Sequence, residues 1–177
     1  TSNVAGTDLV AGLLCAGWQT LPTPPTLPVL GVPIGPYLER ADAEGQAHFQ
    51  VICETLRLAG FTVKPVPVMA DFAEIYEHHQ LIVAAEAAQV HAAWFSQYPD
   101  LYHEKTAALI KRGQAVKAAS LETALAGREI LRQELSTAMA AEGLDLWLSP
   151  PALGPAPSGL ASTGDPVMNL PWTHAGL

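Results

Sequence analysis

Acidic and imidazole side chains come close together in one part of the sequence, just after residue 73. Glu74 and His78 are four residues apart, so on a helix they would share a face and could form half of a metal site. The HExxH pattern of zinc hydrolases is absent, and no spacing in the sequence supplies a third ligand. We therefore predict a polar helix surface here, with no metal ion and no cofactor.

The nucleophilic side chains lack the neighbours that would activate them. The sequence has no G-x-S-x-G elbow, no S-x-x-K pair and no phosphate-binding glycine loop. Ser158 and Ser162 fall in a stretch rich in Pro and Gly, where a serine commonly serves as a turn residue. Cys15 and Cys53 lie in apolar helical segments and are expected to be reduced core residues. The chain is predicted to carry no complete catalytic set.

The last residues of the sequence combine polar and aromatic groups on a chain rich in turns. Asn169, Trp172, Thr173 and His174 offer an amide, an indole, a hydroxyl and an imidazole. A small-molecule pocket needs an apolar wall with a few well-aimed polar groups, and this stretch can supply both. Composition alone favours the other interpretation, a loop packed on a core.

Two short apolar segments and the helix between them would position these groups. Residues 27–34 and 61–68 are typical of buried strands, and Asp42 caps a helix that continues to about residue 59, with Gly60 after its end. This order predicts a βαβ unit with parallel strands. The inward side of its helix is predicted to hold Phe49, Ile52, Cys53, Leu56 and Leu58.

The second of these strands is predicted to lie at an edge of the sheet. Pro65 and Pro67 both lack the backbone N–H that a central strand uses to pair with its neighbours.

The rest of the chain is predicted to be mainly helical, with one more strand. Apolar periodicity and capping residues indicate helices over 8–16, 71–95, 99–119 and 120–141, the last capped by Ser120 and stopped by Gly143. Residues 19–26 are expected to form a loop, and residues 144–149 a third strand. From 150 to 177 six prolines predict irregular chain, which in a compact protein is often functional.

Composition limits the classes of protein to which the chain can belong. With 177 residues it can form one domain with a sizeable core. Only 15% of its residues are charged, against roughly 25% in an ordinary domain, so we expect further chain or a second subunit, as in a homo-oligomer, to cover part of its surface. A net charge of −8 argues against nucleic acid as a partner.

Neither a membrane nor a secretory route is indicated by the sequence. No apolar run reaches the roughly 18–20 residues that span a bilayer, and no charged start precedes an apolar leader, so a cytoplasmic protein is expected. The chain begins without Met and ends on an apolar, turn-rich stretch. We expect it to be a segment of a longer protein.

The order of motifs along the chain resembles the amidase signature family. Residues 8–14 (Asp-Leu-Val-Ala-Gly-Leu-Leu), 30–33 (Leu-Gly-Val-Pro) and 144–152 (Leu-Asp-Leu-Trp-Leu-Ser-Pro-Pro-Ala) follow the family's order. The most specific part is the run Asn-Leu-Pro-Trp-Thr at 169–173, continued by Ala-Gly-Leu at 175–177. The resemblance covers essentially the whole chain and places it downstream of the family's Gly/Ser-rich signature.

The resemblance implies both a fold and a reaction. Family members hydrolyse carbon–nitrogen bonds of amides with a Ser–cis-Ser–Lys triad, on a mixed sheet flanked by helices. Residues 1–177 would be a single partial domain of this α/β/α layered fold, on its C-terminal side, with residues 150–177 as an irregular segment beside the pocket. The expected partners are a small-molecule amide and the remainder of the amidase chain.

The resemblance also limits which residues can be assigned roles. No serine or lysine here matches a triad position, so no catalytic residue is assigned and the segment alone is expected to be inactive. Asn169, Trp172 and Thr173 match family segments that help to shape the substrate pocket, and they are the candidate substrate-binding residues.

Two other functions stay open at this stage. One is a non-catalytic ligand-binding or subunit-interaction module built on the same βαβ core. The other is the amidase subunit that acts on aminoacylated tRNA, to which the acidic balance gives no support. The coding sequence upstream of Thr1 separates the module from the enzyme, because the enzyme requires a Lys followed by a Gly/Ser-rich stretch with two serines.

Overall fold

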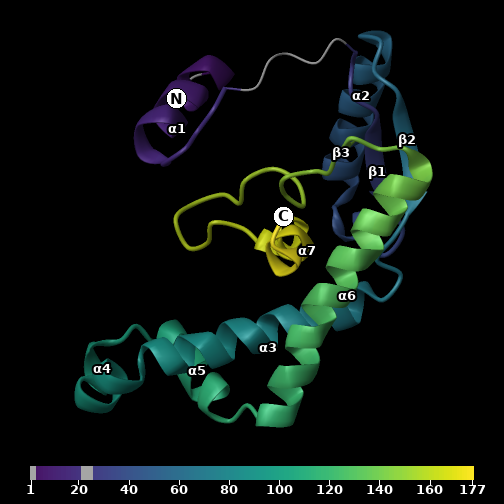
Figure 1. Cartoon of the computed structure of the whole chain (residues 1–177). Helices are drawn as coiled ribbons and strands as arrows, with labels where there is room; N and C mark the ends of the chain where they lie inside the picture. The colour runs from purple at the N-terminus through teal and green to yellow at the C-terminus, as the bar shows by residue number, and fades with distance from the viewer. Residues whose placement is uncertain (1–2, 21–25) are drawn as a thin grey trace.

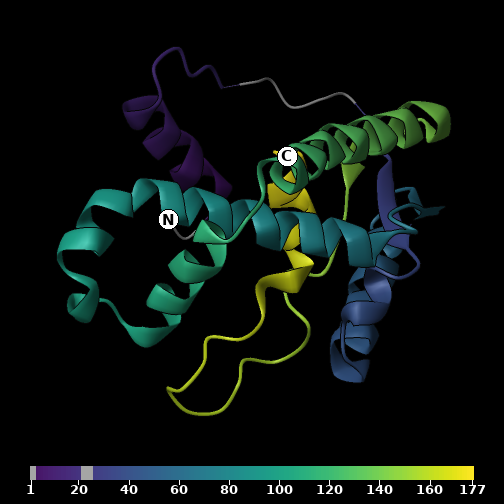
Figure 2. The ribbon, with the colours of Figure 1, turned by 90° about the horizontal axis from the view of Figure 1, so that it is seen from below.

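The computed structural model describes residues 3–20 and 26–177, which form an open parallel sheet with helices on both of its faces (Figure 1). Figure 2 gives the view from below, in which the sheet and α2 lie at one side and the helical arm of α3, α4 and α5 at the other. The elements in chain order are α1 (Val4–Leu14), β1 (Leu30–Ile34), η1 (Leu38–Arg40), α2 (Ala43–Leu58), β2 (Val63–Pro67), α3 (Phe72–Val90), α4 (Ala92–Gln97), η2 (Pro99–Leu101), α5 (Glu104–Gln114), α6 (Ala118–Glu142), β3 (Leu146–Trp147), η3 (Pro166–Met168) and α7 (Leu170–Ala175).

The sheet confirms the predicted α/β class and the predicted βαβ unit. Its strand order is β2-β1-β3, and both strand pairs are parallel. Leu30 of β1 lies opposite Val63 of β2 and opposite Leu146 of β3. β3 is shorter than the predicted strand at 144–149. Asp145, just before it, is bound to Val29 by both of its groups: its backbone N–H donates to the Val29 carbonyl oxygen at 2.9 Å, and its carboxylate accepts from the Val29 N–H at 2.7 Å.

The prolines of β2 lie at the edge of the sheet, as predicted. The backbone N–H of Leu30 donates to the carbonyl oxygen of Thr62 at 2.8 Å, so Thr62 directs its peptide groups toward β1. Because alternate residues of a strand face the same neighbour, Lys64 and Val66 do the same. Pro65 and Pro67 fall in the other set, whose peptide groups face the open edge. The missing N–H groups therefore belong to the outer side of β2, where they remove no bond to β1.

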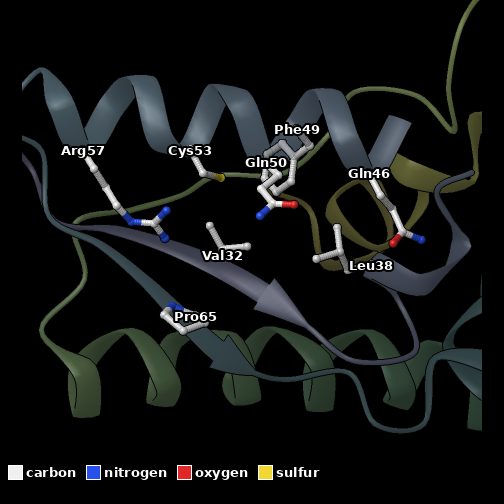
Figure 3. Close-up of a pocket in the computed structure, with 8 residues that line it drawn as sticks. All are labelled: Val32, Leu38, Gln46, Phe49, Gln50, Cys53, Arg57 and Pro65. Carbon is white, nitrogen blue, oxygen red and sulfur yellow. The ribbon is translucent and has the colours of Figure 1, made fainter. Parts of the chain in front are cut away.

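The two faces of the sheet are covered by different amounts of helix. On one face α2 packs on the strands through buried Phe49 and Cys53. On the other face α3, α6 and α7 meet, and α6 passes along the strands on the side opposite α2 (Figures 1 and 3). The larger core lies on this second face, and its largest fully buried side chains include Tyr37, Met69, Leu131, Leu135, Val167 and Met168.

Some residues expected in the core are exposed instead. Phe49 and Cys53 are buried as predicted, but Ile52 and Leu58 are exposed, since α2 presents only a narrow stripe to the strands. Cys15 is also exposed, contrary to prediction, because it follows α1, in which no residue is buried.

The helical middle differs from its prediction at several boundaries. The predicted helix over 71–95 is broken at His91 into α3 and α4, and the predicted start at Pro99 is only a short 3-10 turn before α5. Ser120 lies inside α6, which starts two residues earlier, on the strong helix former Ala118. Gly143 ends this helix in the left-handed conformation, as predicted. In the residues described here, no helix is long and apolar enough to span a membrane.

The last part of the chain is irregular only as far as residue 165. η3 and α7 follow, because the Asp165 side chain accepts a hydrogen bond from the Val167 N–H at 2.9 Å and both turns carry a proline in their first positions. Proline is favoured there, where its missing N–H costs nothing. The predicted loop at 19–26 shows no regular structure in its described residues, and its positions 21–25 lie outside the described part.

Candidate functional site

The carboxyl ends of the three parallel strands meet at one edge of the sheet, which is where open α/β folds bind ligands. After β1 the chain reaches Tyr37, after β2 Met69 and after β3 Ser149. Tyr37 and Met69 share a buried cluster with Met168 of the tail. This edge therefore joins the predicted tail to three residues that sequence analysis did not select.

Tyr37 connects the sheet to the tail. Its side chain is fully buried, and its hydroxyl donates a hydrogen bond to the Met168 carbonyl oxygen at 2.8 Å. The same hydroxyl accepts a bond from the Trp172 indole Nε1 at 3.1 Å and is hydrogen-bonded to the Ser149 side chain. Burial raises the pKa of Tyr37 above its ordinary value, and the bonds to Ser149 and Trp172 oppose this shift. The phenol is therefore neutral and serves as a fixed anchor.

Met69 holds the end of β2 in a strained conformation. Its φ of 57° lies in the left-handed region, which costs a non-glycine residue about 1–3 kcal/mol. The residue is fully buried, and its backbone N–H donates to the Glu134 carboxylate at 2.8 Å, which fixes the chain against α6. Strain of this kind gathers at functional sites, and here it lies at the edge of the sheet where a ligand is expected.

Two of the predicted substrate-binding residues, Asn169 and Thr173, lie on one exposed turn at the start of α7. The Asn169 amide donates from Nδ2 to the Pro151 carbonyl oxygen at 2.9 Å. The Thr173 hydroxyl donates to the Asn169 carbonyl oxygen at 3.1 Å. The first bond ties the turn to the chain after β3, and the second lies within the turn. The Asn169 Oδ1 atom has no hydrogen-bond partner among the described residues, so it is the free polar atom of this turn.

Trp172, the third predicted residue, is half-buried between two aromatic rings. Its ring centroid lies 5.9 Å from that of Tyr37 in an edge-on arrangement and 6.2 Å from that of Trp147. Its indole N–H is used by the Tyr37 hydroxyl, whereas the indole N–H of Trp147 is buried without a partner in the described part of the chain. Trp172 therefore presents an apolar surface and no free donor.

A hollow of about 500 Å³ lies beside this turn, between the first half of α2 and the chain that follows β3. Its walls are mostly apolar, with one acid and one imidazole on the α2 side; they include Glu44, His48, Phe49, Ile52, Leu148, Ser149, Pro150 and Pro151. Ser149 belongs also to the Tyr37 network, and Pro151 also binds Asn169. None of the three predicted residues lines the hollow, and Asn169 reaches its border through the bond to Pro151.

The chain after β3 is fixed closely to the start of α2. The Asp42 N–H donates to the Leu153 carbonyl oxygen at 2.8 Å, and the Asp42 carboxylate caps α2 by accepting from the Gly45 N–H at 2.7 Å. A side chain at Gly45 would overlap the backbone of Leu153, and one at Gly154 would push against the Asp42 carboxylate, so both glycines allow this close approach. The hollow consequently has one rigid wall.

A second hollow, of about 300 Å³, opens between α2 and the strands β1 and β2 (Figure 3). Val32 and Pro65 contribute from the strands, and Gln50, Cys53 and Arg57 extend from α2 toward them. Burial raises the pKa of the Cys53 thiol, so it stays protonated and is a poor nucleophile. This hollow is an apolar groove with a polar rim.

Histidines of α3 and α7 meet on the other side of the sheet. The ring centroids of His79 and His174 are 5.6 Å apart, and His174 is only 2% exposed, with both ring nitrogens unpartnered among the described residues. Burial, assisted by His79 and Arg128, lowers the pKa of His174 to about 4, so the ring is neutral. Arg128 Nε donates to the His174 carbonyl oxygen at 3.1 Å, and Arg132 Nε donates to the Ala175 carbonyl oxygen at 2.8 Å. The two arginines thus cap the C-terminal end of α7.

The acid–imidazole pair selected from the sequence does form. His78 Nε2 lies 3.7 Å from the Glu74 carboxylate on α3, and the ring is half-buried against Gly127 of α6. Within the described ranges, no group of three His, Cys, Asp or Glu side chains is placed to hold a metal ion. The pair therefore lies along one face of α3, with the imidazole between this helix and α6.

The arrangement can hold a ligand but does not assemble a nucleophile. Across residues 3–20 and 26–177, no hydrogen bond joins a serine or cysteine side chain to a histidine or a carboxylate. Sequence reasoning missed Tyr37 and Ser149, although Tyr37 comes three residues after one predicted strand and Ser149 is the last residue of another. Applying the rule that ligands bind at the carboxyl ends of parallel strands to every strand would have selected both.

Comparison with known proteins gives a likeness in structure alone. No protein-family model matches this chain, and no curated protein matches it in sequence. A crystal structure of an amidase superposes on it with a TM-score of 0.84 and 24% identity. The match covers 99% of this chain and 42% of the amidase chain, so the present chain spans less than half of that protein's length. At this identity the likeness establishes the fold.

Proposed function

We propose that this chain is the C-terminal-side part of an amidase of the amidase signature family, an enzyme that hydrolyses the carbon–nitrogen bond of an amide. The observation that carries the proposal is the superposition of nearly the whole chain on an amidase. The sequence adds the family's closing run at 169–173, which in this fold lies at the carboxyl edge of the sheet.

In the proposed reaction a serine outside this segment attacks the amide carbonyl and expels the amine. Water then hydrolyses the serine ester, and the Ser–cis-Ser–Lys triad moves the protons. A nucleophile needs a base and donors for the oxyanion in one preorganised cavity. The present chain supplies none of these groups and is proposed to contribute part of the sheet and one wall of the pocket.

The predicted residues take different roles in this proposal. The free Oδ1 of Asn169 is the atom proposed to face the substrate, because the other polar groups of its turn are already bonded. Trp172 contributes an apolar wall held in place by Tyr37. The hollow beside Pro151 supplies room for the substituent of a small amide.

The test compares the protein encoded by the whole reading frame with the segment 1–177. We expect the whole protein to release ammonia from a panel of primary aliphatic and aromatic amides and to form hydroxamates when hydroxylamine replaces water. The segment alone should do neither. Turnover by pure 1–177, or a reading frame without a Lys and a Gly/Ser-rich stretch with two serines upstream of Thr1, would overturn the proposal.

The site assignment is tested in the same whole protein. Asn169→Ala should raise KM or lower kcat/KM by about tenfold, the loss expected for one hydrogen bond to substrate. Thr163→Ala, an exposed position in the irregular chain before η3, is the matched control and should leave both constants unchanged. Equal behaviour of the two variants would remove Asn169 from the substrate site.

A further inference from the structure

The groove between α2 and the strands β1 and β2 is lined from the helix by one stripe of side chains (Figure 3). Gln46, Gln50, Cys53 and Arg57 follow one another at intervals of four, three and four residues, so they lie along a single face of α2. At 1.5 Å of rise per residue, the stripe is about 16 Å long. The groove is therefore elongated, with Arg57 at one end and Gln46 at the other.

The floor of the groove is apolar and well buried. Val32 of β1 and Phe49 of α2 are each 7% exposed, and Leu38 of η1 packs against the same cluster. Sites for small molecules are concave and mostly apolar, with a few polar groups that orient the ligand. A volume of about 300 Å³ is at the lower end of their range. The shape and the lining therefore suit a narrow apolar chain.

The groove holds one formal charge, which belongs to Arg57. Of the eight described residues that line the groove, Arg57 alone is charged, and Figure 3 shows its guanidinium group extending from α2 toward the strands. Burial raises the pKa of the Cys53 thiol, and the positive charge of Arg57 opposes this shift. The charge therefore acts inside the groove.

One edge of the Arg57 guanidinium group is free to bind an anion. Nη1 lies 3.4 Å from the Glu54 carboxylate, in a pair whose two side chains are 43% and 61% exposed. An exposed pair of this kind contributes little free energy. Nε and Nη2, which share the opposite edge, have no hydrogen-bond partner in the described part of the chain. Two parallel N–H donors of an arginine match the two oxygens of a carboxylate.

The groove is separate from the carboxyl edge of the sheet. Phe49 is the single described residue that lines both this groove and the hollow beside Pro151. On the other side the groove reaches the edge strand β2 through Pro65. Pro65 and Pro67 lack the N–H groups that an added strand would need, so the sheet cannot be continued past this side of the groove.

We propose that the groove binds a small monocarboxylate with an unbranched apolar chain, as in a medium-chain fatty acid. The carboxylate binds Nε and Nη2 of Arg57, and the chain lies on Val32 and Phe49 and points toward Gln46. Charge complementarity selects the anion, because no lining residue compensates the charge of Arg57. The apolar floor selects the chain. This site is independent of the proposed function.

Calorimetric titration of the protein from the whole reading frame with sodium octanoate, below its micelle concentration, tests the proposal. Octanoate should bind, and butyrate should bind at least about tenfold more weakly, because each buried methylene strengthens binding by about fourfold. 1-Octanol, which has the chain without the charge, should also bind at least about tenfold more weakly. No binding of octanoate, or equal binding of octanoate and octanol, would overturn the proposal.

The two cysteines report where the ligand lies. Saturating octanoate should slow the alkylation of Cys53 by iodoacetamide about tenfold, because the chain covers the thiol. Cys15, which is exposed after α1, is the matched control and should react at an unchanged rate. Mass spectrometry of the two peptides measures both rates. Binding of octanoate without protection of Cys53 would place the ligand elsewhere and overturn the proposal.

Variants of two arginines and one acid make the test specific. Arg57→Gln should weaken octanoate binding about tenfold, and Arg40→Gln, at an exposed arginine of η1 outside the groove, should leave it unchanged. Glu54→Gln should strengthen it about two- to threefold by releasing Nη1. A general loss of stability would not produce these opposite changes. If the two arginine variants bind octanoate equally, Arg57 does not hold the carboxylate and the proposal is wrong.

Discussion

The two faces of the sheet are built from the same strands but are closed to different degrees. The face under α2 is covered by one helix and keeps a groove of about 300 Å³ between helix and strands. The opposite face is sealed by α3, α6 and α7, together with the turn η3 before α7, and its core includes residues with no exposed surface at all. Closure therefore depends on how much chain returns to a face, because the α2 face receives more of the apolar strand residues, Leu30, Val32 and Val63, and is still the more open one.

The sealed face should carry most of the stability of the segment. Leu135 of α6 is fully buried there, and Leu135→Ala should lower the free energy of unfolding by about 2–5 kcal/mol, through lost burial and the cavity left behind. Leu58→Ala, at an 82% exposed residue of α2, should change it by less than about 0.5 kcal/mol. Urea unfolding of both variants measures the difference, and equal losses would contradict the comparison.

Acid should weaken the sealed face. The pKa of His174 is lowered to about 4 from its ordinary 6.5. Between these two pH values the His174 side chain is protonated in the unfolded chain and neutral in the folded chain. The contribution of this difference to the free energy of unfolding is fully present above pH 6.5, and it falls by about 3 kcal/mol as the pH drops to 4. His174→Phe should remove this part of the pH dependence, as measured by urea unfolding at pH 7, 5.5 and 4.5.

The exposed His48 supplies the control for this titration. His48→Gln should keep the same slope of stability against pH as the unmodified segment, since its side chain is exposed. If both variants retain the slope, acid acts on the fold through groups other than His174.

The hydroxyl of Tyr37 should matter because it holds the tail on the sealed face. Tyr37→Phe leaves the Met168 carbonyl oxygen and the Trp172 indole N–H without their shared partner, which should cost about 1–3 kcal/mol. Fluorescence of the tryptophans should also shift, since Trp172 lies against this ring. A variant as stable as the parent segment would show that water replaces the hydroxyl.

The open face should tolerate, and even gain from, a larger apolar side chain. Gln50 reaches from α2 over the groove, and Gln50→Leu should raise the free energy of unfolding by about 0.5–1 kcal/mol by filling part of the groove with apolar atoms. Gln97→Leu, at an exposed position of α4, should give no gain. Thermal unfolding compares the two, and a loss in the Gln50 variant would mean that the groove is already filled.

Local signals predicted the elements that depend on neighbouring residues. Asp42 caps α2, Gly143 ends α6, and the apolar runs around Leu30 and Val63 became paired parallel strands. The helix break at His91 and the turns begun by Pro166 and Pro171 were missed. A high proline content predicts irregular chain, although proline also favours the first turn of a helix.

The candidate site could be predicted only in part. The sequence indicated the tail around Asn169 and Trp172, and the structure places both at the carboxyl edge of the sheet. It could not indicate that the Trp172 indole binds Tyr37, because 135 residues separate them in the chain. It also could not show that His174 is buried, since burial there depends on α3 and α6 closing over α7.

The two prolines of β2 also decide how copies of this chain can associate. A sheet with two free parallel edges could stack end to end, with β3 of one copy adding to β2 of the next, and such head-to-tail contacts grow into filaments. Pro65 and Pro67 remove the outward N–H groups that the incoming strand would need. The sheet can therefore be extended only at its β3 edge. Copies of this chain with an uncovered β3 edge are thus protected from stacking into a fibre.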